Sequence, residues 1–227
     1  MIIGNGLIAS ACSRHFGDNQ NVIAFASGVS NSRENRSEAF LREKQMLIEA
    51  LRRPQMLLYF STCSVEDPEL RNTAYVVHKL EMEALVQSAA DYSIFRLPQV
   101  VGKAPNPNTL TNFICQKILD GTHFQVWRHA KRNLIDVEDV ALICSYLVQS
   151  SRANNRIVSI ASPFDVSVTQ LVSIFELVLG VKANYSFIEA GGTYLIDTSV
   201  AFDVARKIGL NFSDVYVERL IRKYYGK

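Results

Sequence analysis

The stretch "LLYFSTCSVEDPELRNTAYVVHKLEME", residues 57–83, carries the features that decide the fold. Its apolar start is typical of a buried strand, and the strand ends in the hydroxyls of Ser61 and Thr62. Open parallel α/β sheets place their active sites at this carboxyl end of a strand. Tyr75 and Lys79 follow four positions apart in a helix-forming run, so they share one helix face. Taken alone, the pair is either an acid–base couple or one exposed turn of an amphipathic helix.

The composition predicts a globular protein with a large core. Hydrophobic residues make up 48% of the 227 residues and charged residues 20%, which excludes a disordered or fibrous chain. The net charge of +2 gives no reason to expect nucleic acid or a membrane as a partner. The cysteines form no CxxC pair and the histidines lack metal-ligand spacing, so we expect no metal site. With no signal peptide or membrane span in the sequence, we expect a soluble, cytoplasmic protein.

Strand-like and helix-like segments alternate along the chain, which predicts an α/β fold with a parallel sheet and helices on both faces. We expect a shortened, Rossmann-like, doubly wound sheet with a small C-terminal α/β lobe. The Rossmann-like domain is predicted from residues 1–102 and 134–160, and the substrate-binding lobe from 103–133 and 161–227. Strand-like runs stand at 1–3, 21–27, 55–62, 92–102, 123–127, 155–162 and 184–190, and helix-like runs at 7–16, 39–53, 74–89, 110–120, 167–180, 199–209 and 213–225, while 133–150 reads as a strand or loop followed by a helix.

The segment "GNGLIA", residues 4–9, follows the pattern G-x-G-x-x-A between a short strand and a helix. In a dinucleotide fold such glycines make the tight turn and admit the pyrophosphate at the helix N-terminus. A glycine-bearing turn without a ligand gives the same pattern. The acidic residue that should follow about twenty positions later is missing, because Asp18 lies in the polar turn "FGDNQN" with no strand before it. The sequence therefore predicts that the strand–helix–strand unit that holds adenosine is deleted.

A series of motifs in the correct order resembles the extended short-chain dehydrogenase/reductase superfamily, in its NAD-dependent epimerase/dehydratase group that modifies nucleotide sugars. The resemblance implies NAD or NADP as cofactor, a nucleotide-sugar substrate, a role in polysaccharide biosynthesis and a homodimer. The motifs are "GNGLIA", "AFASG" (24–28), "STCSV" (61–65), "AYVVHKLEME" (74–83), "FRLPQVVG" (95–102) and "RNLIDVEDVA" (132–141).

The resemblance also implies a role for each site residue. Thr62 would orient the substrate oxygen, Tyr75 would be the acid/base, and Lys79 would lower the pKa of Tyr75 and hold the nicotinamide ribose. The implied cofactor-binding residues are Gly4, Gly6, Leu7, Ile8, Ala26, Ser27, Gly28, Ser61, Tyr75, Lys79 and Pro98. The implied substrate-binding residues are Thr62, Asn112 and Arg132, whose planar fork suits a diphosphate.

Two residues near the expected substrate site can be interpreted in more than one way. Asn112 reads equally well as an ordinary amide on a helix surface. Trp127 could border a nucleotide base, although a core tryptophan is the favoured interpretation.

The sequence thus predicts an NAD(P)-dependent nucleotide-sugar epimerase or 4-ketoreductase. Cys63 and Ser64 stand where the 4,6-dehydratases of the family carry an Asp-Glu pair, so we do not expect dehydration. The alternative is a non-catalytic nucleotide- or nucleotide-sugar-binding protein that kept the fold and lost strong cofactor binding. The missing strand favours that alternative, and the complete set of Thr62, Tyr75 and Lys79 disfavours it.

Overall fold

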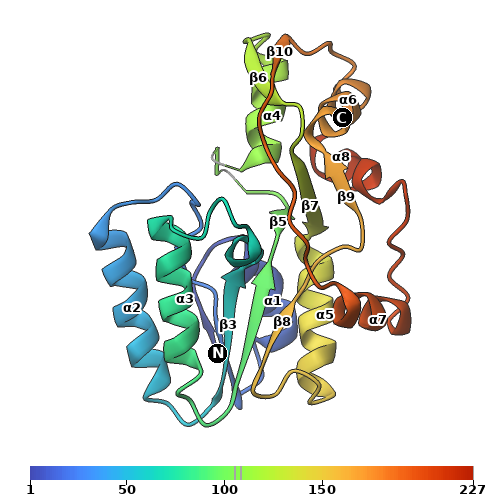
Figure 1. Ribbon diagram of the computed structural model, residues 1–227. Coiled ribbons are helices and arrows are strands. Elements are labelled where there is room, and N and C mark those ends of the chain that lie inside the picture. The colour runs from blue at the N-terminus through green and yellow to red at the C-terminus, as the bar shows by residue number, and fades with distance from the viewer. Residues whose placement is uncertain (105, 108, 227) are drawn as a thin grey trace.

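The computed structural model of the protein describes residues 1–104, 106–107 and 109–226. Two residues of the turn-forming stretch 103–109, Pro105 and Asn108, lie outside the described residues. Figure 1 shows a lower part, in which a parallel sheet stands between two layers of helices, and a smaller upper part.

Among the described residues, five parallel strands form the main sheet in the order β1-β2-β3-β4-β8. The central strand β3 is buried along its whole length, as its apolar sequence predicts. Its pairing with β4 runs from Leu57 opposite Tyr92 to Thr62 opposite Leu97, so both strands end at the same edge. The strands are β1 (Ile2–Ile3), β2 (Val22–Phe25), β3 (Met56–Thr62), β4 (Tyr92–Leu97) and β8 (Arg156–Ser159).

Helices cover both faces of this sheet, as a doubly wound fold requires. Ala24 and Leu58 point into one core, which they share with helices α1 and α5. Ile23 and Leu57, their neighbours along the strands, point into a second core against α2 and α3. The bounds of these helices are α1 (Leu7–Phe16), α2 (Ser37–Leu51), α3 (Ala74–Val86) and α5 (Val137–Gln149).

The connection from β1 to β2 has an unusual hand. The steps β1 to β2, β2 to β3 and β3 to β4 all move in the same direction across the sheet. Helices α2 and α3 lie on one face and α1 lies on the other, so the first connection has the opposite hand to the next two. Nearly all parallel crossovers are right-handed, and β1–α1–β2 is therefore the left-handed one. The short turn at residues 17–21 replaces the deleted unit, as the sequence predicts.

The upper part of the molecule contains two small sheets and three helices. The strand predicted over residues 92–102 divides at Pro98, because proline has no N–H to continue the ladder. The first piece, β4, stays in the main sheet, and the second, β5, joins a sheet of order β5-β7-β9. The elements are β5 (Gln99–Val101), α4 (Leu110–Leu119), β6 (Phe124–Trp127), β7 (Lys131–Asp136), β9 (Asp165–Ser167), α6 (Val168–Leu179), β10 (Tyr185–Ile188) and α8 (Tyr216–Tyr225), with β6 paired to β10.

Helix α7 (Ser199–Lys207), which we predicted within the substrate lobe, packs against α5 and β8 of the lower part. The segment that leads to it, residues 189–198, runs from β10 down the molecule between the two parts (Figure 1). No helix among the described residues has the length and apolar character needed to cross a membrane.

Candidate active site

The loops that follow β1 and β2 meet at the edge of the sheet. Gly4 has a φ of +126°, and a Cβ there would lie 2.4 Å from the carbonyl oxygen of Ala26, so only glycine fits this contact. Gly6 precedes α1 in extended conformation, and a Cβ there would meet nothing within 4 Å. Helix α1 has neither a capping side chain nor an acidic residue in its first turn. The turn therefore offers an anion the open N-terminus of a helix.

Thr62 and Tyr75 lie together at the carboxyl end of β3. The Thr62 hydroxyl accepts the backbone N–H of Ser64 at 3.1 Å, which begins the short helix η1 (Cys63–Glu66). Helix α3 begins after Thr73, whose hydroxyl accepts the N–H of Val76, and this start places Tyr75 in its first turn. Thr62 acts to lower the pKa of Tyr75, so the two side chains lie near each other at this edge. The structure thus brings together two of the three predicted catalytic residues.

The environment of Tyr75 differs from our expectation. Burial raises the pKa of Tyr75 to about 12, against the opposing hydrogen bond from Thr62. Lys79 lies one turn further along α3, and its Nζ is 6.0 Å from the centroid of the Tyr75 ring. Lys79 is not among the groups that lower the pKa of Tyr75 in this conformation, and its predicted role toward Tyr75 stays a prediction.

The ammonium of Lys79 is directed instead at a buried carboxylate, Glu43 of α2. The Lys79 Nζ donates to Glu43 Oε1 at 3.0 Å and to the Tyr59 hydroxyl at 3.1 Å. Glu43 Oε1 also accepts the Tyr59 hydroxyl at 2.7 Å, while its Oε2 accepts the Val29 N–H at 2.6 Å and lies 3.1 Å from His78 Nε2. Lys79 is 2% exposed and Glu43 is fully buried. We name Glu43, Tyr59, His78 and Lys79 the Glu43 cluster.

The charges of the Glu43 cluster balance within it. Burial alone would raise the pKa of Glu43, but His78, Lys79, Tyr59 and the Val29 N–H more than offset this and hold it at about 2. Burial lowers the pKa of Lys79, and the neighbouring Glu43 opposes that shift. The Nε2 of His78 lies within hydrogen-bond distance of this carboxylate, at 3.1 Å from its Oε2.

The sequence contained one signal for Glu43 that we did not use. Glu43, Leu47 and Ala50 lie on one helical face and are all buried. A carboxylate on an apolar helix face needs a partner, because an unpaired buried charge is costly.

Ser61, a predicted cofactor-binding residue, is bonded to a second buried carboxylate. Its hydroxyl donates to Glu83 Oε1 at 2.5 Å. The guanidinium of Arg96 grips the same carboxylate at 3.0 and 2.7 Å and also contacts Glu66. Ser61 is 6% exposed, so it acts as a structural link between β3 and α3 in this conformation. Its predicted contact with the cofactor remains a prediction.

The two predicted phosphate-binding residues lie in different settings. Asn112 in α4 donates to the carbonyls of Ala104 and Asn106 at 3.0 and 2.7 Å and accepts the Tyr225 hydroxyl at 2.6 Å. It therefore ties the loop before α4 to α8 and is not a free surface amide. Arg132, at the start of β7, is half-buried, and its guanidinium donates to the carbonyl of Lys131 at 2.7 Å in an exposed contact.

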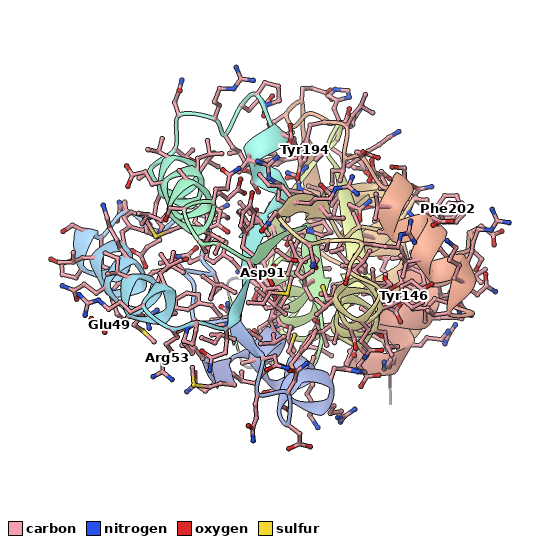
Figure 2. The ribbon with its side chains drawn as sticks, turned by 90° about the horizontal axis from the view of Figure 1, so that it is seen from below. Glu49, Arg53, Asp91, Tyr146, Tyr194 and Phe202 are labelled. Carbon is pink, nitrogen blue, oxygen red and sulfur yellow. The ribbon has the colours of Figure 1, made fainter. Side chains whose placement is uncertain are left out.

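Tyr194 lies at the same edge and was missed by the sequence analysis. Figure 2 shows it beside η1, and Ser64 of η1 acts to lower its pKa. Burial raises the pKa of Tyr194 to about 12, while nearby Arg132 opposes that shift. The tyrosine comes from the segment 189–198, whose glycines and lack of periodicity gave no sequence signal. The expected core position of Trp127 is also wrong, because this side chain is 41% exposed.

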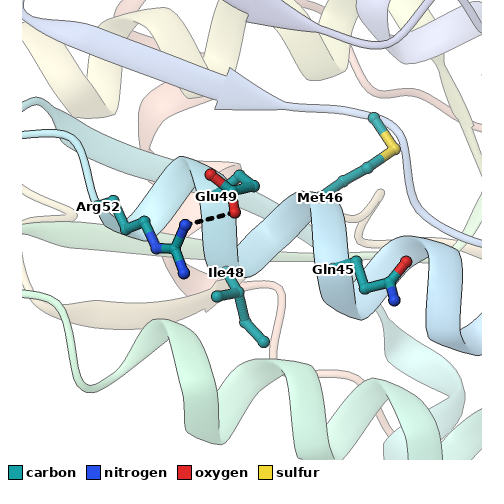
Figure 3. Close-up of a pocket in the computed structure, with 5 residues that line it drawn as sticks. All are labelled: Gln45, Met46, Ile48, Glu49 and Arg52. Carbon is teal, nitrogen blue, oxygen red and sulfur yellow. Dashed lines mark hydrogen bonds and ion pairs between the residues drawn. The ribbon is translucent and has the colours of Figure 1, made fainter.

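A surface hollow lies away from these residues. It measures about 460 Å³ and runs along the C-terminal half of α2 (Figure 3). Its lining includes the exposed ion pair between Glu49 and Arg52, with 2.6 Å between charged atoms. None of the predicted site residues lines it. Among the described residues, no group of three or more possible ligands could hold a metal ion.

Solved nucleotide-sugar enzymes share this fold. The UDP-glucuronic acid 4-epimerase from Bacillus cereus, solved with UDP-glucuronic acid and NAD, matches with a TM-score of 0.71 at 14% identity, over 97% of this chain and 79% of that one. The UDP-glucose 4-epimerase from Thermotoga maritima, solved with UDP-glucose, matches with a TM-score of 0.68 at 14% identity, over 96% and 81%. MoeE5, solved with UDP-glucose and NAD, gives 0.68 at 18% identity, over 96% and 82%. At such identities the likeness establishes a Rossmann-like epimerase fold.

The comparison of the sequence with protein-family models identifies the family. The chain belongs to the NAD dependent epimerase/dehydratase family, whose model matches residues 7–161. No curated protein matches the sequence.

The chain fits one part of a dinucleotide and not another. The open Gly6 and the N-terminus of α1 suit a pyrophosphate. Gly28 provides a second close approach, because a Cβ there would lie 2.6 Å from the Nζ of Lys79. On the adenosine side the fit fails, because within the described part of the chain β1 pairs with β2 alone and no further strand follows it.

Proposed function

We propose that the protein is an NAD(P)-dependent enzyme that acts on a nucleotide sugar, as an epimerase or a 4-ketoreductase, with Tyr75 as its acid/base. The observation that carries the proposal is the placement of Thr62 at the carboxyl end of β3 beside Tyr75 in the first turn of α3, with Lys79 one turn further on. A tyrosine at this position can move a proton to or from a sugar oxygen that Thr62 orients. Membership of the family and the ligands of the matched structures support the choice of cofactor and substrate class.

We further propose which residues hold the ligands. When bound, NAD(P) supplies or accepts the hydride. The pyrophosphate would lie against the turn formed by Gly4, Gly6, Leu7 and Ile8, and the remainder of the cofactor would follow the edge formed by Ala26, Ser27, Gly28, Ser61, Tyr75, Lys79 and Pro98. Arg132 would pair with the diphosphate of the sugar nucleotide, because its guanidinium is committed to the exposed carbonyl of Lys131 and to no carboxylate that the structure shows. Asn112 can take part only if it gives up bonds to the loop before α4.

Thermal stabilisation tests the proposal directly, because a ligand that binds only the folded state raises its stability. The protein is heated with NAD, NADH, NADP or NADPH, each with and without UDP-glucose or UDP-glucuronic acid. We expect at least one cofactor and one sugar nucleotide to raise the midpoint, and Tyr75→Phe to keep this binding while losing turnover. Tyr75→Phe turning over substrate at the parent rate would remove the proposed proton transfer.

A non-catalytic binding protein is the second candidate. Two observations favour it: the missing strand beside β1 and the pairing of Lys79 with Glu43. In that case sugar nucleotides stabilise the fold, whereas none of the cofactors does so at millimolar concentration. The same titration therefore separates the two candidates.

We also propose that the protein forms a homodimer through α2 and α3. Leu41 and Ile48 on α2 are exposed on one face, and Val77 and Leu80 are exposed on the neighbouring α3. Figure 1 shows the two helices side by side on the outside of the sheet. Apolar side chains exposed together in this way are typical of an association surface.

A further inference from the structure

The loop that follows β2 lies between two cations, which come from the helices on one face of the sheet. A Cβ at Gly28 would lie 2.6 Å from the Nζ of Lys79 on α3. Arg42 on α2 donates from Nη2 to the carbonyl oxygen of Ser27 at 3.1 Å. Lys79 is buried and pairs with Glu43 at 3.0 Å, whereas Arg42 is exposed. One of the two charges is therefore balanced inside the protein, and the other faces solvent.

The contacts of the Arg42 guanidinium are all with neutral atoms. Its Nη1 lies 3.4 Å from the Ser27 Oγ and 3.6 Å from the Met46 Sδ. The other contact is the one from Nη2 to the Ser27 carbonyl. Arg52 on the same helix differs, because it pairs with the carboxylate of Glu49 at 2.6 Å. A guanidinium carries five N–H donors, so the contacts of Arg42 hold it over the loop and leave donors for an anion.

This loop touches the turn proposed for the pyrophosphate. A Cβ at Gly4 would lie 2.4 Å from the carbonyl oxygen of Ala26 and 3.1 Å from the nitrogen of Ser27. Arg42 is therefore bonded to a residue that contacts the turn. The N-terminus of α1 beside Gly6 carries a positive charge of about half a unit. A dinucleotide carries a negative charge on each phosphate of its pyrophosphate, so the helix balances only part of the ligand's charge.

We propose that Arg42 binds a phosphate of the dinucleotide cofactor, and that this contact from α2 anchors the cofactor in a sheet whose described part has no strand for the adenosine. The phosphate is that of the pyrophosphate or the 2′-phosphate of NADP, and the planar fork of arginine suits both. The sequence does not select against the 2′-phosphate, because it lacks the acidic residue that holds an unphosphorylated ribose. The inference rests on the proposed function and adds a binding residue to it.

A role in holding the loop after β2 is the structural alternative for Arg42. That role needs a hydrogen-bond donor to the carbonyl of Ser27 and no charge. Glutamine keeps a donor and removes the charge, so Arg42→Gln separates the two roles. Arg42→Lys keeps the charge and removes the planar fork. Arg52→Gln is the matched control, because it removes an exposed guanidinium from the same helix.

Isothermal titration calorimetry with NADH, NADPH and inorganic pyrophosphate tests the inference without turnover. We expect Arg42→Gln to weaken the binding of at least one dinucleotide by about tenfold, which is the effect of one charge-assisted hydrogen bond. Arg42→Lys should fall between Arg42→Gln and the wild type, and Arg52→Gln should bind as the wild type does. A loss shared by all three ligands assigns Arg42 to the pyrophosphate, and a loss for NADPH alone assigns it to the 2′-phosphate.

Ionic strength gives a readout that a role in holding the loop would not move. An exposed ion pair is screened by salt, so the difference between the wild type and Arg42→Gln should shrink as the ionic strength rises from about 0.05 M to about 0.5 M. A difference that stays constant over this range identifies a structural role and overturns the inference.

The outcomes also separate this inference from the proposed function. Equal affinities of the wild type and Arg42→Gln for every ligand overturn the inference, and the proposed function stands as long as a dinucleotide binds. Binding of pyrophosphate alone, weakened by Arg42→Gln, contradicts the proposed function and retains Arg42 as a phosphate-binding residue. No binding of any ligand at millimolar concentration overturns both. If Arg42→Gln does not fold, Arg42→Lys decides, because unchanged affinity without the planar fork overturns the inference.

Discussion

Lowering the pH removes the charge on Glu43 and is expected to weaken the fold by a calculable amount. The contacts of the Glu43 cluster lower the pKa of Glu43 from 4.5 to about 2. At 1.36 kcal/mol per pKa unit, this difference corresponds to about 3 kcal/mol of folding free energy. A carboxylate whose pKa is lowered by folding stabilises the protein above its unfolded pKa. This contribution is therefore full above about pH 5 and is lost as the pH falls towards about 2.

Glu43→Gln isolates this contribution from the titration of the other carboxylates. At neutral pH the variant leaves Lys79 buried without its counter-ion, which is expected to cost about 3–5 kcal/mol. As the pH falls to about 2, the wild-type protein loses its own advantage, so the difference between the two proteins should shrink by about 3 kcal/mol. Glu49→Gln is the matched control, because its ion pair with Arg52 is exposed and is worth less than about 1 kcal/mol.

The assay is urea unfolding followed by the fluorescence of Trp127, repeated at several pH values between neutral and about pH 2.5. The free energies of the wild-type protein and the two variants are then compared at each pH. Curves for the wild type and Glu43→Gln that stay parallel across the acid range would refute the reasoning. So would a neutral-pH loss in Glu43→Gln no larger than that in Glu49→Gln.

Four further substitutions test other parts of the structure. Gly4→Ala would place a Cβ 2.4 Å from the carbonyl oxygen of Ala26 at a residue with positive φ, and should lower the free energy of unfolding in urea by more than about 2 kcal/mol. Gly6→Ala meets no such contact and should cost about 1 kcal/mol or less, while weakening the thermal stabilisation by NAD(P). Arg96→Met leaves the carboxylate of Glu83 buried without its cation and should lower the free energy of unfolding by about 3–5 kcal/mol. A loss below about 1 kcal/mol in urea unfolding would contradict the role of the buried pair. Leu80→Glu places a charge on the exposed face of α3 and should convert a dimer to a monomer in light scattering, without changing the unfolding curve of the monomer.

The helices and strands were largely predictable because their signals are local. The helix predicted over residues 7–16 forms with those bounds, since the apolar spacing begins after Gly6 and ends before Gly17. The strand β9 was missed because three residues carry too little pattern to separate a strand from a loop. The division of residues 92–102 follows from Pro98, which we expected only to end the pairing.

The site was predictable in its composition and not in its charge balance. Thr62 and Tyr75 are joined by the end of one strand and the start of the next helix, so their proximity follows from local structure. Glu43 and Lys79 are 36 positions apart, and their contact exists only because α2 and α3 pack on the same face of the sheet. Sequence spacing therefore predicts where Lys79 stands on its helix, while tertiary packing decides which group its ammonium meets.

The shortened sheet keeps the divergence of neighbouring strands on which the crevice of a dinucleotide fold depends. Such crevices form where neighbouring strands send the chain to opposite faces of the sheet. Strand β1 leads into α1 and β2 leads into α2, and these helices lie on opposite faces. The left-handed β1–α1–β2 connection is the consequence, because α1 has kept its face while the strand that it reaches has changed. The close contact of Gly4 with Ala26 joins the two loops at the point of divergence. The surfaces proposed for the pyrophosphate and for the reacting end of a cofactor therefore rest on β1, β2 and β3, and within the described part of the chain no further strand lies beside β1.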